Sequence, residues 1–411
     1  MLDRPSFEAL DRDDPLAAFR ERFLLPPGVI YLDGNSLGAL PKAVPERMRQ
    51  VVAREWGGGL IRSWNAAHWI DLPREVGDKI APLIGAEPGE VVAADSTSVN
   101  LFKLLSAALE LQKRRSVILS EADNFPTDLY VAEGVRDQLG RGHRLRLVAG
   151  EELVSAISEE VAVVMATQVN FRTGFLHDLE AVTAAAHRKG ALMLWDLSHS
   201  AGAMPVALGR ARADLAVGCG YKYLNGGPGA PAFLYVRRDL QDRIRPPLSG
   251  WMGHREPFAF VRDYAPAEGI ARNLCGTPPI LALAALDAAL DLWREVDLEA
   301  VRRKSIALSE LFIGLVEERC AGLGLSLATP REAERRGSQV SFRHPEGYAV
   351  MQALIAEGVI GDFRSPDLLR FGFTPLYLRY IDAFDAVAVL ESILRARRWD
   401  RPEFRRRAAV T

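Results

Sequence analysis

Two residues at the ends of neighbouring β-like segments have the types and the spacing that one kind of chemistry needs. The segment ALMLWD (191–196) ends in Asp196, and the next segment, LAVGCG (215–220), leads to Lys222 in a glycine-rich turn. A lysine that forms a Schiff base must be desolvated and must keep an accessible neutral amine. A carboxylate that pairs with a pyridine nitrogen keeps the ring protonated and electron-withdrawing. The pair therefore predicts a cofactor that carries both an aldehyde and a pyridine ring, which is pyridoxal phosphate.

Each of these two residues has a simpler explanation when it is taken alone. An aspartate at a strand end is often a helix cap, and a lysine in a turn is usually only solvated. The order of Asp196 and Lys222 in an alternating α/β pattern favours the cofactor, because such sheets bind ligands at the carboxyl ends of their strands.

Hydroxyl side chains precede a predicted helix and offer a seat for the phosphate group. Ser96, Thr97 and Ser98 lie between the strand candidate 91–95 and a helix that begins near Val99. A helix N-terminus with hydroxyls and free N–H groups binds anions well. Plain N-capping is the alternative, and it would win if the cofactor prediction did not call for a phosphate site.

Two further side chains follow strand ends at the same predicted edge. His199 lies three residues after Asp196 and is predicted to contact the cofactor, although a packed or capping histidine is the alternative. Phe125, in NFPTD (124–128), follows another strand candidate. Stacking on the cofactor ring and packing in the core are equally good predictions for it.

The elements that must position these residues are those of an α/β fold with a largely parallel sheet. Helical stretches are predicted at 99–112 and 178–189. The strand candidates between and around them are VVAAD (91–95), SVILSE (116–121), AVVMAT (162–167), ALMLWD (191–196), LAVGCG (215–220) and APAFLYV (230–236).

From about Ile280 onwards, the alternation of short strands and helices gives way to longer helical stretches. Two long amphipathic stretches, 280–296 and 298–319, precede a smaller strand–helix–strand unit that ends in a helix at 381–398. We therefore expect a large cofactor-binding domain over 51–280 and a smaller α/β domain formed by 1–50 and 281–411.

The bulk composition excludes several classes of protein. Charge is nearly balanced, with 51 Lys and Arg against 53 Asp and Glu, so no nucleic-acid or membrane partner is expected. The arginine-rich end, 395–407, is interrupted by acidic residues and predicts a solvated helix end. The N-terminus lacks an export signal, so the three scattered cysteines predict reduced thiols in the cytoplasm, with no metal site.

Several segments together resemble the kynureninase family. The resemblance rests on YLDGNSLG (31–38), WGGGLIRSW (56–64), STSVNL (96–101), NFPTD (124–128), WDLSHSAGAMP (195–205), GYKYLNGGPGAP (220–231) and SGWMGH (249–254). It extends from about Tyr31 to about Arg379. It implies a PLP-dependent transferase fold of type I, a homodimer, and hydrolysis of L-kynurenine to anthranilate and L-alanine, with 3-hydroxy-L-kynurenine as a possible second substrate.

The resemblance also implies roles for individual residues. Lys222 would be the Schiff-base lysine, Asp196 the partner of the pyridine nitrogen, and Tyr221 a proton donor or acceptor as well as a phosphate ligand. Arg370, in LLRFGFTPLY, would hold the substrate carboxylate, and Trp64 would contact the substrate. The other implied cofactor contacts are Thr97, Ser98, Phe125, Asp128, Thr167 and His199, with Trp251 and Thr277 reaching the phosphate from the second subunit.

Two rival functions share this fold. A cysteine desulfurase or selenocysteine lyase needs a reactive cysteine on a mobile loop, whereas Cys219 lies inside a strand candidate and Cys275 precedes Pro278–Pro279. A cofactor-free scaffold would have no use for Asp196 and Lys222 together.

Overall fold

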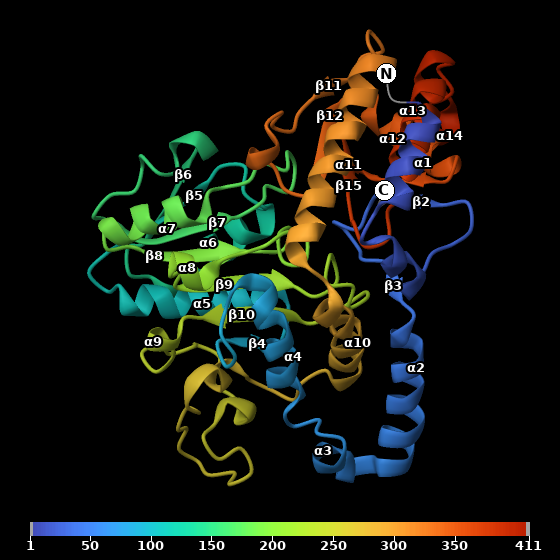
Figure 1. Cartoon of the computed structure of the whole chain (residues 1–411). Coiled ribbons are helices and arrows are strands. Elements are labelled where there is room, and N and C mark those ends of the chain that lie inside the picture. Colours follow the sequence, from blue (N-terminus) through green and yellow to red (C-terminus); the bar gives the residue numbers. More distant parts are fainter. Residues whose placement is uncertain (1–2, 408–411) are drawn as a thin grey trace. The chain divides into compact units, whose positions relative to one another are not determined.

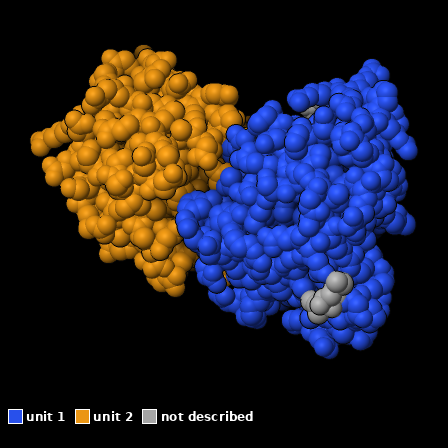
Figure 2. All heavy atoms as spheres, turned by 90° about the horizontal axis from the view of Figure 1, so that it is seen from above, with its two compact units in different colours: residues 1–43, 171–176, 295–411 blue, residues 44–170, 177–294 orange. Residues whose placement is uncertain are grey.

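The chain folds into two compact units, coloured separately in Figure 2. The computed structural model describes residues 3–407. Unit 1 contains Met1–Ala43, Phe171–Leu176 and Glu295–Thr411, and unit 2 contains Val44–Asn170 and His177–Arg294.

The described part of unit 2 is built on a seven-stranded sheet. β5 to β9 run parallel to one another, and β10 runs antiparallel to both of its neighbours, β9 and β4. The strands, in spatial order, are β4 (Val91–Ala93), β10 (Ala232–Val236), β9 (Leu215–Cys219), β8 (Leu192–Asp196), β7 (Val161–Thr167), β5 (Val117–Glu121) and β6 (Arg144–Val148).

All six predicted strands are confirmed, and one strand was missed. The central strands are apolar and almost entirely buried, as expected for a sheet covered on both faces. The missed strand, β6, has the sequence RLRLV and is only partly buried at the edge of the sheet. Its charged residues concealed it, because edge strands commonly carry charges.

Helices cover this sheet and fix the ends of its strands (Figure 1). α5 (Thr97–Leu111) packs against β7, β8, β9 and β10, and α7 (Leu179–Arg188) packs against β8. α6 (Pro126–Leu139) lies against α5, and α4 (Leu72–Ile80) packs on β4. Shorter helices complete the unit: α2 (Ala43–Gln50), α3 (Ser63–Ala66), α8 (Leu208–Ala211) and α9 (Arg238–Gln241).

The boundaries of unit 2 differ from the predicted 51–280. α10 (Ile280–Leu290) packs on α4 and therefore belongs to unit 2, which extends to Arg294. At the other end, Val44 packs against Ala288 and Ala289 of α10, so unit 2 already begins at Val44.

Unit 1 is an antiparallel sheet with helices packed beside it. Its strands, in spatial order, are β11 (Ser326–Leu327), β12 (Gln339–Arg343), β15 (Leu368–Gly372) and β14 (Asp362–Arg364). Its helices are α1 (Arg4–Arg12), α11 (Leu298–Arg319), α12 (Gly347–Ala356), α13 (Tyr380–Arg395) and α14 (Pro402–Arg405). α11, α12 and α1 all pack against α13.

The N-terminal segment is woven into the same unit. β2 (Ile30–Tyr31) pairs in parallel with β13 (Val359–Ile360), and β1 (Phe23–Leu24) pairs with β3 (Leu40–Pro41). Just beyond β2, Asp33 forms an isolated bridge with Gly372, at the end of β15. None of the helices within residues 3–407 combines the length and the apolarity needed to cross a bilayer.

Candidate active site

The predicted cofactor residues of unit 2 follow strands that end at one edge of the sheet. β5, β7, β8 and β9 are parallel, and β4 runs in their direction because both β4 and β9 are antiparallel to β10. The carboxyl ends of these strands therefore lead to Ser96, Phe125, Thr167, Asp196 and Lys222 on the same side. This is the edge at which sheets of this type bind ligands.

Two buried carboxyl groups meet at this edge. Asp196 is the last residue of β8, and Oδ1 accepts a hydrogen bond from the Ser198 N–H at 2.7 Å. Asp128 lies in the first turn of α6, and its carboxyl group is hydrogen-bonded to Asp196. Burial raises the pKa of both groups, and the negative charge of Asp196 raises the pKa of Asp128 further.

This pair fits the cofactor. Two carboxyl groups in contact inside a protein hold a proton between them unless a cation is near. Lys222 already lowers the pKa of both Asp128 and Asp196. A protonated pyridine nitrogen beside Asp196 would supply the second positive charge in the same place.

A polar chain supports the carboxyl groups from the neighbouring strands. Thr167, at the end of β7, donates its hydroxyl to Asn124 Oδ1 and lies 3.5 Å from Asp128 Oδ2. Asn124 in turn donates to the Ser120 hydroxyl at 3.1 Å. Sequence reasoning quoted Asn124 only as part of NFPTD and gave it no role. Its position three residues after the end of β5 was the available signal.

Lys222 sits among three of the predicted residues. Its Nζ lies 3.0 Å from His199 Nε2, 5.8 Å from the centroid of the Tyr221 ring and 6.0 Å from that of Phe125. Burial raises the pKa of the Tyr221 hydroxyl, which therefore keeps its proton. Phe125 is 39% exposed, so the core-packing alternative for it is wrong.

The predicted phosphate seat is the N-terminus of α5. Ser96 is the N-cap, and its Oγ accepts a hydrogen bond from the Val99 N–H at 3.3 Å. The capping interpretation is thus confirmed for Ser96. Thr97 and Ser98 are the first two helical residues, whose N–H groups have no acceptor within a helix, so this terminus suits an anion.

The aromatic residues predicted near the site form a chain of ring contacts. Trp64, in α3, lies 6.1 Å from Trp69 and 6.4 Å from Trp251 between ring centroids. Trp251 lies 5.6 Å from Phe258. Thr277 is exposed, in the segment that leads to α10.

Arg370 lies in unit 1, where it is buried in β15 with only 1% of its side chain exposed. Its Nε donates to Asp362 Oδ1 at 2.8 Å, and Nη2 also contacts Asp362 Oδ2. Nη2 donates to the Ser36 hydroxyl at 2.8 Å, and Nη1 donates to the Phe171 carbonyl at 2.7 Å. Arg370 is therefore a buried ion-pair partner of Asp362 and not a surface residue. Sequence reasoning missed Asp362 and Ser36, although Ser36 belongs to the quoted segment YLDGNSLG.

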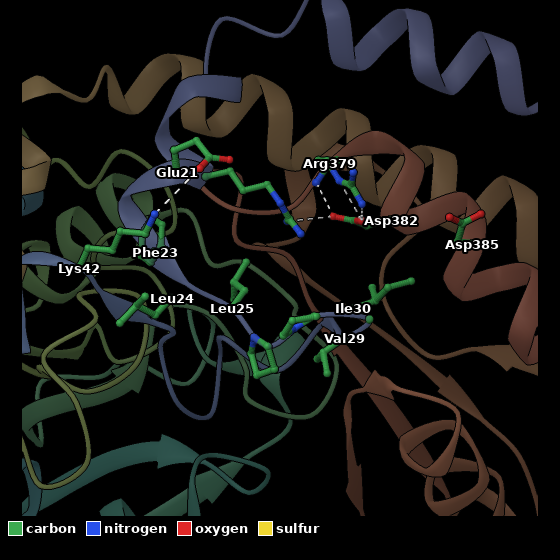
Figure 3. Close-up of a pocket in the computed structure, with 14 residues that line it drawn as sticks. Glu21, Phe23, Leu24, Leu25, Val29, Ile30, Lys42, Arg379, Asp382 and Asp385 are labelled. Carbon is green, nitrogen blue, oxygen red and sulfur yellow. Dashed lines mark hydrogen bonds and ion pairs between the residues drawn. The ribbon is translucent and has the colours of Figure 1, made fainter.

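A pocket of about 530 Å³ opens elsewhere in unit 1 (Figure 3). Its charged groups are paired: Asp382 with Arg20 at 3.2 Å and with Arg379 at 2.7 Å, Lys42 with Glu21 at 3.9 Å, and Asp385 with Arg4 outside the pocket. None of its lining residues was predicted to bind cofactor or substrate. With its charges compensated, the pocket offers little to a charged ligand.

The mostly parallel sheet of unit 2 is that of the PLP-dependent transferase fold of type I. Solved structures support that class: the apo cysteine desulfurase from Thermococcus onnurineus NA1 matches with a TM-score of 0.75 and 22% identity, covering 95% of this chain and 98% of that chain. An Escherichia coli cysteine desulfurase matches with a TM-score of 0.77 and 20% identity, covering 93% and 98%. At these identities the likeness concerns the fold alone.

The sequence relatives identify the family. A family model described as the kynureninase C-terminal domain matches residues 301–390. Kynureninase from Burkholderia pseudomallei (strain 1106a) is 58% identical over 416 residues, and kynureninase from Pseudomonas fluorescens is 56% identical, each with full coverage of both chains. The chain belongs to the kynureninase family, and pyridoxal phosphate is its cofactor.

Proposed function

We propose that Lys222, Asp196 and Tyr221 carry out the hydrolysis of L-kynurenine to anthranilate and L-alanine in this chain. The observation that carries the assignment is the buried Asp128–Asp196 pair, whose pKa values respond to Lys222 at the ligand-binding edge of the sheet. The family relationship supplies the reaction, and this edge supplies side chains with the right chemistry.

The cofactor, when bound, supplies an aldehyde for the substrate amine and an electron-accepting ring for the Cβ–Cγ cleavage. Asp196 would keep the ring nitrogen protonated, because its negative charge stabilises the pyridinium form. Lys222 Nζ removes the proton from the substrate α-carbon, and His199 Nε2, 3.0 Å away, orients that amine. The Tyr221 hydroxyl, which holds its proton, donates a hydrogen bond to the phosphate or a proton in the late steps.

Further residues bind and orient. Thr97 and Ser98 hold the phosphate at the α5 N-terminus, with Asp128 and Thr167 supporting Asp196 and Phe125 covering the ring. Arg370 binds the substrate carboxylate through its planar guanidinium, and Trp64 contacts the aromatic ring of the substrate. These roles follow from the family resemblance of each segment.

We also infer that the active enzyme is a homodimer located in the cytoplasm. Large apolar side chains are exposed in two segments that the Trp64–Trp251 contact joins: Ile61 is 78% exposed and Phe260 is 77% exposed. Such surfaces usually mark a partner. Trp251 and Thr277 lie in or near these segments and would reach the phosphate of the second subunit. The free cysteines suit a reducing compartment.

One assay tests the function directly. The purified protein, supplied with pyridoxal phosphate, is mixed with L-kynurenine and separately with 3-hydroxy-L-kynurenine, and the fluorescence of the anthranilate products is followed. We expect release of anthranilate with equimolar L-alanine. Release of alanine and sulfur from L-cysteine, with no anthranilate from L-kynurenine, would favour a desulfurase instead.

A further inference from the structure

Arg370 belongs to a cluster of two arginines and two aspartates within unit 1. Asp362 is 2% exposed, contacts Arg370 with both oxygens and lies 2.8 Å from Arg364 Nη2. Asp33 is placed beside them by its bridge to Gly372, two residues beyond Arg370. With all four groups ionised, the cluster carries no net charge.

Asp362 fixes the orientation of the Arg370 guanidinium, whose Nη1 donates to the Phe171 carbonyl and keeps one further N–H. Its two oxygens engage Nε and Nη2 along one edge of the planar guanidinium. The Ser36 hydroxyl links the two side chains, donating to Asp362 Oδ2 at 2.5 Å and accepting from Arg370 Nη2 at 2.8 Å. A two-pronged contact leaves a planar group little rotational freedom, so the other edge of the guanidinium has a set orientation.

The surroundings of Asp33 favour its protonated form. The charged and titratable groups that act on it are Asp362 and Arg364 from β14, Arg370 from β15 and Tyr31 from β2. Burial, followed by the charge of Asp362, raises the pKa of Asp33 to about 7, while Arg370 opposes the shift. Asp33 Oδ1 is buried and has no hydrogen-bond partner among residues 3–407.

A carboxylate that binds to Arg370 would make the net charge of this cluster negative. It adds one negative charge beside Arg370, and a second anion nearby disfavours the ionised form of a buried carboxyl group. Protonation of Asp33 returns the cluster to neutrality, because one arginine then pairs with Asp362 and the other with the ligand.

We propose that Asp362 is the positioning residue of Arg370, and that Asp33 becomes fully protonated, with the proton taken from water, when a carboxylate binds to Arg370. The proton adds to the carboxylate of Asp33 and leaves when the ligand leaves. The inference rests on the proposed role of Arg370, and it adds two residues and a proton to that role.

Kinetics of the holoenzyme with L-kynurenine test the positioning role. Asp362→Asn keeps the shape but loses the charge, so KM should rise about tenfold or more while kcat changes far less. The visible absorbance of the bound cofactor should not change. Ser36→Ala, a milder change, should raise KM several-fold and serves as the second variant if Asp362→Asn does not fold.

Arg370→Ala distinguishes a failure of the carboxylate-binding role of Arg370 from a failure of the positioning role of Asp362. If Arg370→Ala leaves KM within a factor of two of wild type, the carboxylate-binding role itself is wrong. If Arg370→Ala raises KM strongly while both Asp362→Asn and Ser36→Ala keep the wild-type KM, only the positioning role is overturned.

Calorimetry of L-alanine binding at pH 7 tests the proton. Binding enthalpies measured in phosphate and in Tris, which differ in ionisation enthalpy, give the number of protons taken up. Because the pKa of Asp33 is about 7, wild type should take up about half a proton more than Asp33→Asn. Asp13→Asn, at an exposed aspartate, should match wild type. Equal uptake by wild type and Asp33→Asn would overturn the role of Asp33.

Discussion

At the scale of single residues, two buried aspartates have different surroundings, and we propose different roles for them. Asp128 and Asp196 are both buried at one sheet edge, yet the pKa of Asp128 is raised well above its ordinary range, partly by the charge of Asp196. We therefore propose that Asp196 is the carboxylate of the pair and that Asp128 is the acid that donates a hydrogen bond to it. Sequence spacing alone could not assign these roles, because they depend on the hydrogen bonds and charges around each buried group.

Asparagine substitutions distinguish the two aspartates. Asp196→Asn removes the anion beside the pyridine nitrogen, a charge-assisted bond worth about 2–3 kcal/mol, so kcat/KM should fall about 100-fold. Asp128→Asn keeps a neutral hydrogen-bond donor, so its kcat/KM should fall only about tenfold. Steady-state rates with L-kynurenine measure both. Equal losses in the two variants would contradict the division of roles.

Lys222 is tested by covalent chemistry as well as by rate. Lys222→Ala should abolish turnover and leave no cofactor attached to the protein after borohydride reduction, since the only amine assigned to that bond is gone. The control is Lys113→Ala, where the lysine side chain is 66% exposed. Mass spectrometry of the reduced protein reads the outcome, and a cofactor adduct on another lysine of Lys222→Ala would refute the assignment.

At the scale of elements, tight contacts between backbones hold the strand ends in register. Gly77 of α4 lies so close to β4 that an added Cβ would meet the Val91 carbonyl oxygen at 2.2 Å. β4 in turn leads to Ser96 and the N-terminus of α5. The position of the phosphate seat thus depends on a helix that contributes no ligand to it.

A matched pair of glycine substitutions measures this contact. Gly77→Ala should destabilise the protein by about 1–3 kcal/mol, because the backbone of β4 must move to admit the methyl group. Gly134→Ala, in α6, meets nothing within 4 Å and should stabilise by about 0.5–1 kcal/mol through helix propensity. Urea unfolding gives both values. A stabilised Gly77→Ala would mean that α4 does not pack this closely on β4.

The elements that sequence predicted well are those whose pattern is local. The buried strands are continuous apolar runs, and the predicted helix at 298–319 coincides with α11. β6, by contrast, carries charges, and the pairing of Asp362 with Arg370 depends on the register of β14 against β15, which no local pattern encodes. The limits of the units were misplaced for the same reason, since they depend on α10 packing against the distant α4.

At the scale of the whole molecule, the proposed homodimer would give the exposed aromatic surface of unit 2 a function. The ring contacts from Trp64 through Trp251 and Phe258 end in Phe260, which is 77% exposed. Residues expected to complete the cofactor site of a second subunit lie in the same region. Assembly and activity should therefore be lost together.

A charge in this surface tests the dimer. Phe260→Asp should halve the mass measured by analytical ultracentrifugation, because a buried unpaired charge costs several kcal/mol at an interface. Its affinity for the cofactor should fall as well. Tyr130→Asp, at a tyrosine that is 66% exposed on α6, should leave the mass unchanged. A dimeric Phe260→Asp would place the interface elsewhere.

The three-part composition of unit 1 has a consequence for the order in which the protein is made. Unit 2 is complete once Arg294 has left the ribosome, whereas unit 1 needs residues from both ends of the chain. β2 has no partner strand until Val359–Ile360 has been synthesised. Domains fold as their residues emerge, so the N-terminal segment remains unfolded through most of translation. Phe23 and Leu32, which are buried in the finished protein, are exposed to solvent or to a chaperone during that time. The segment around β2 is thus made early and folds late.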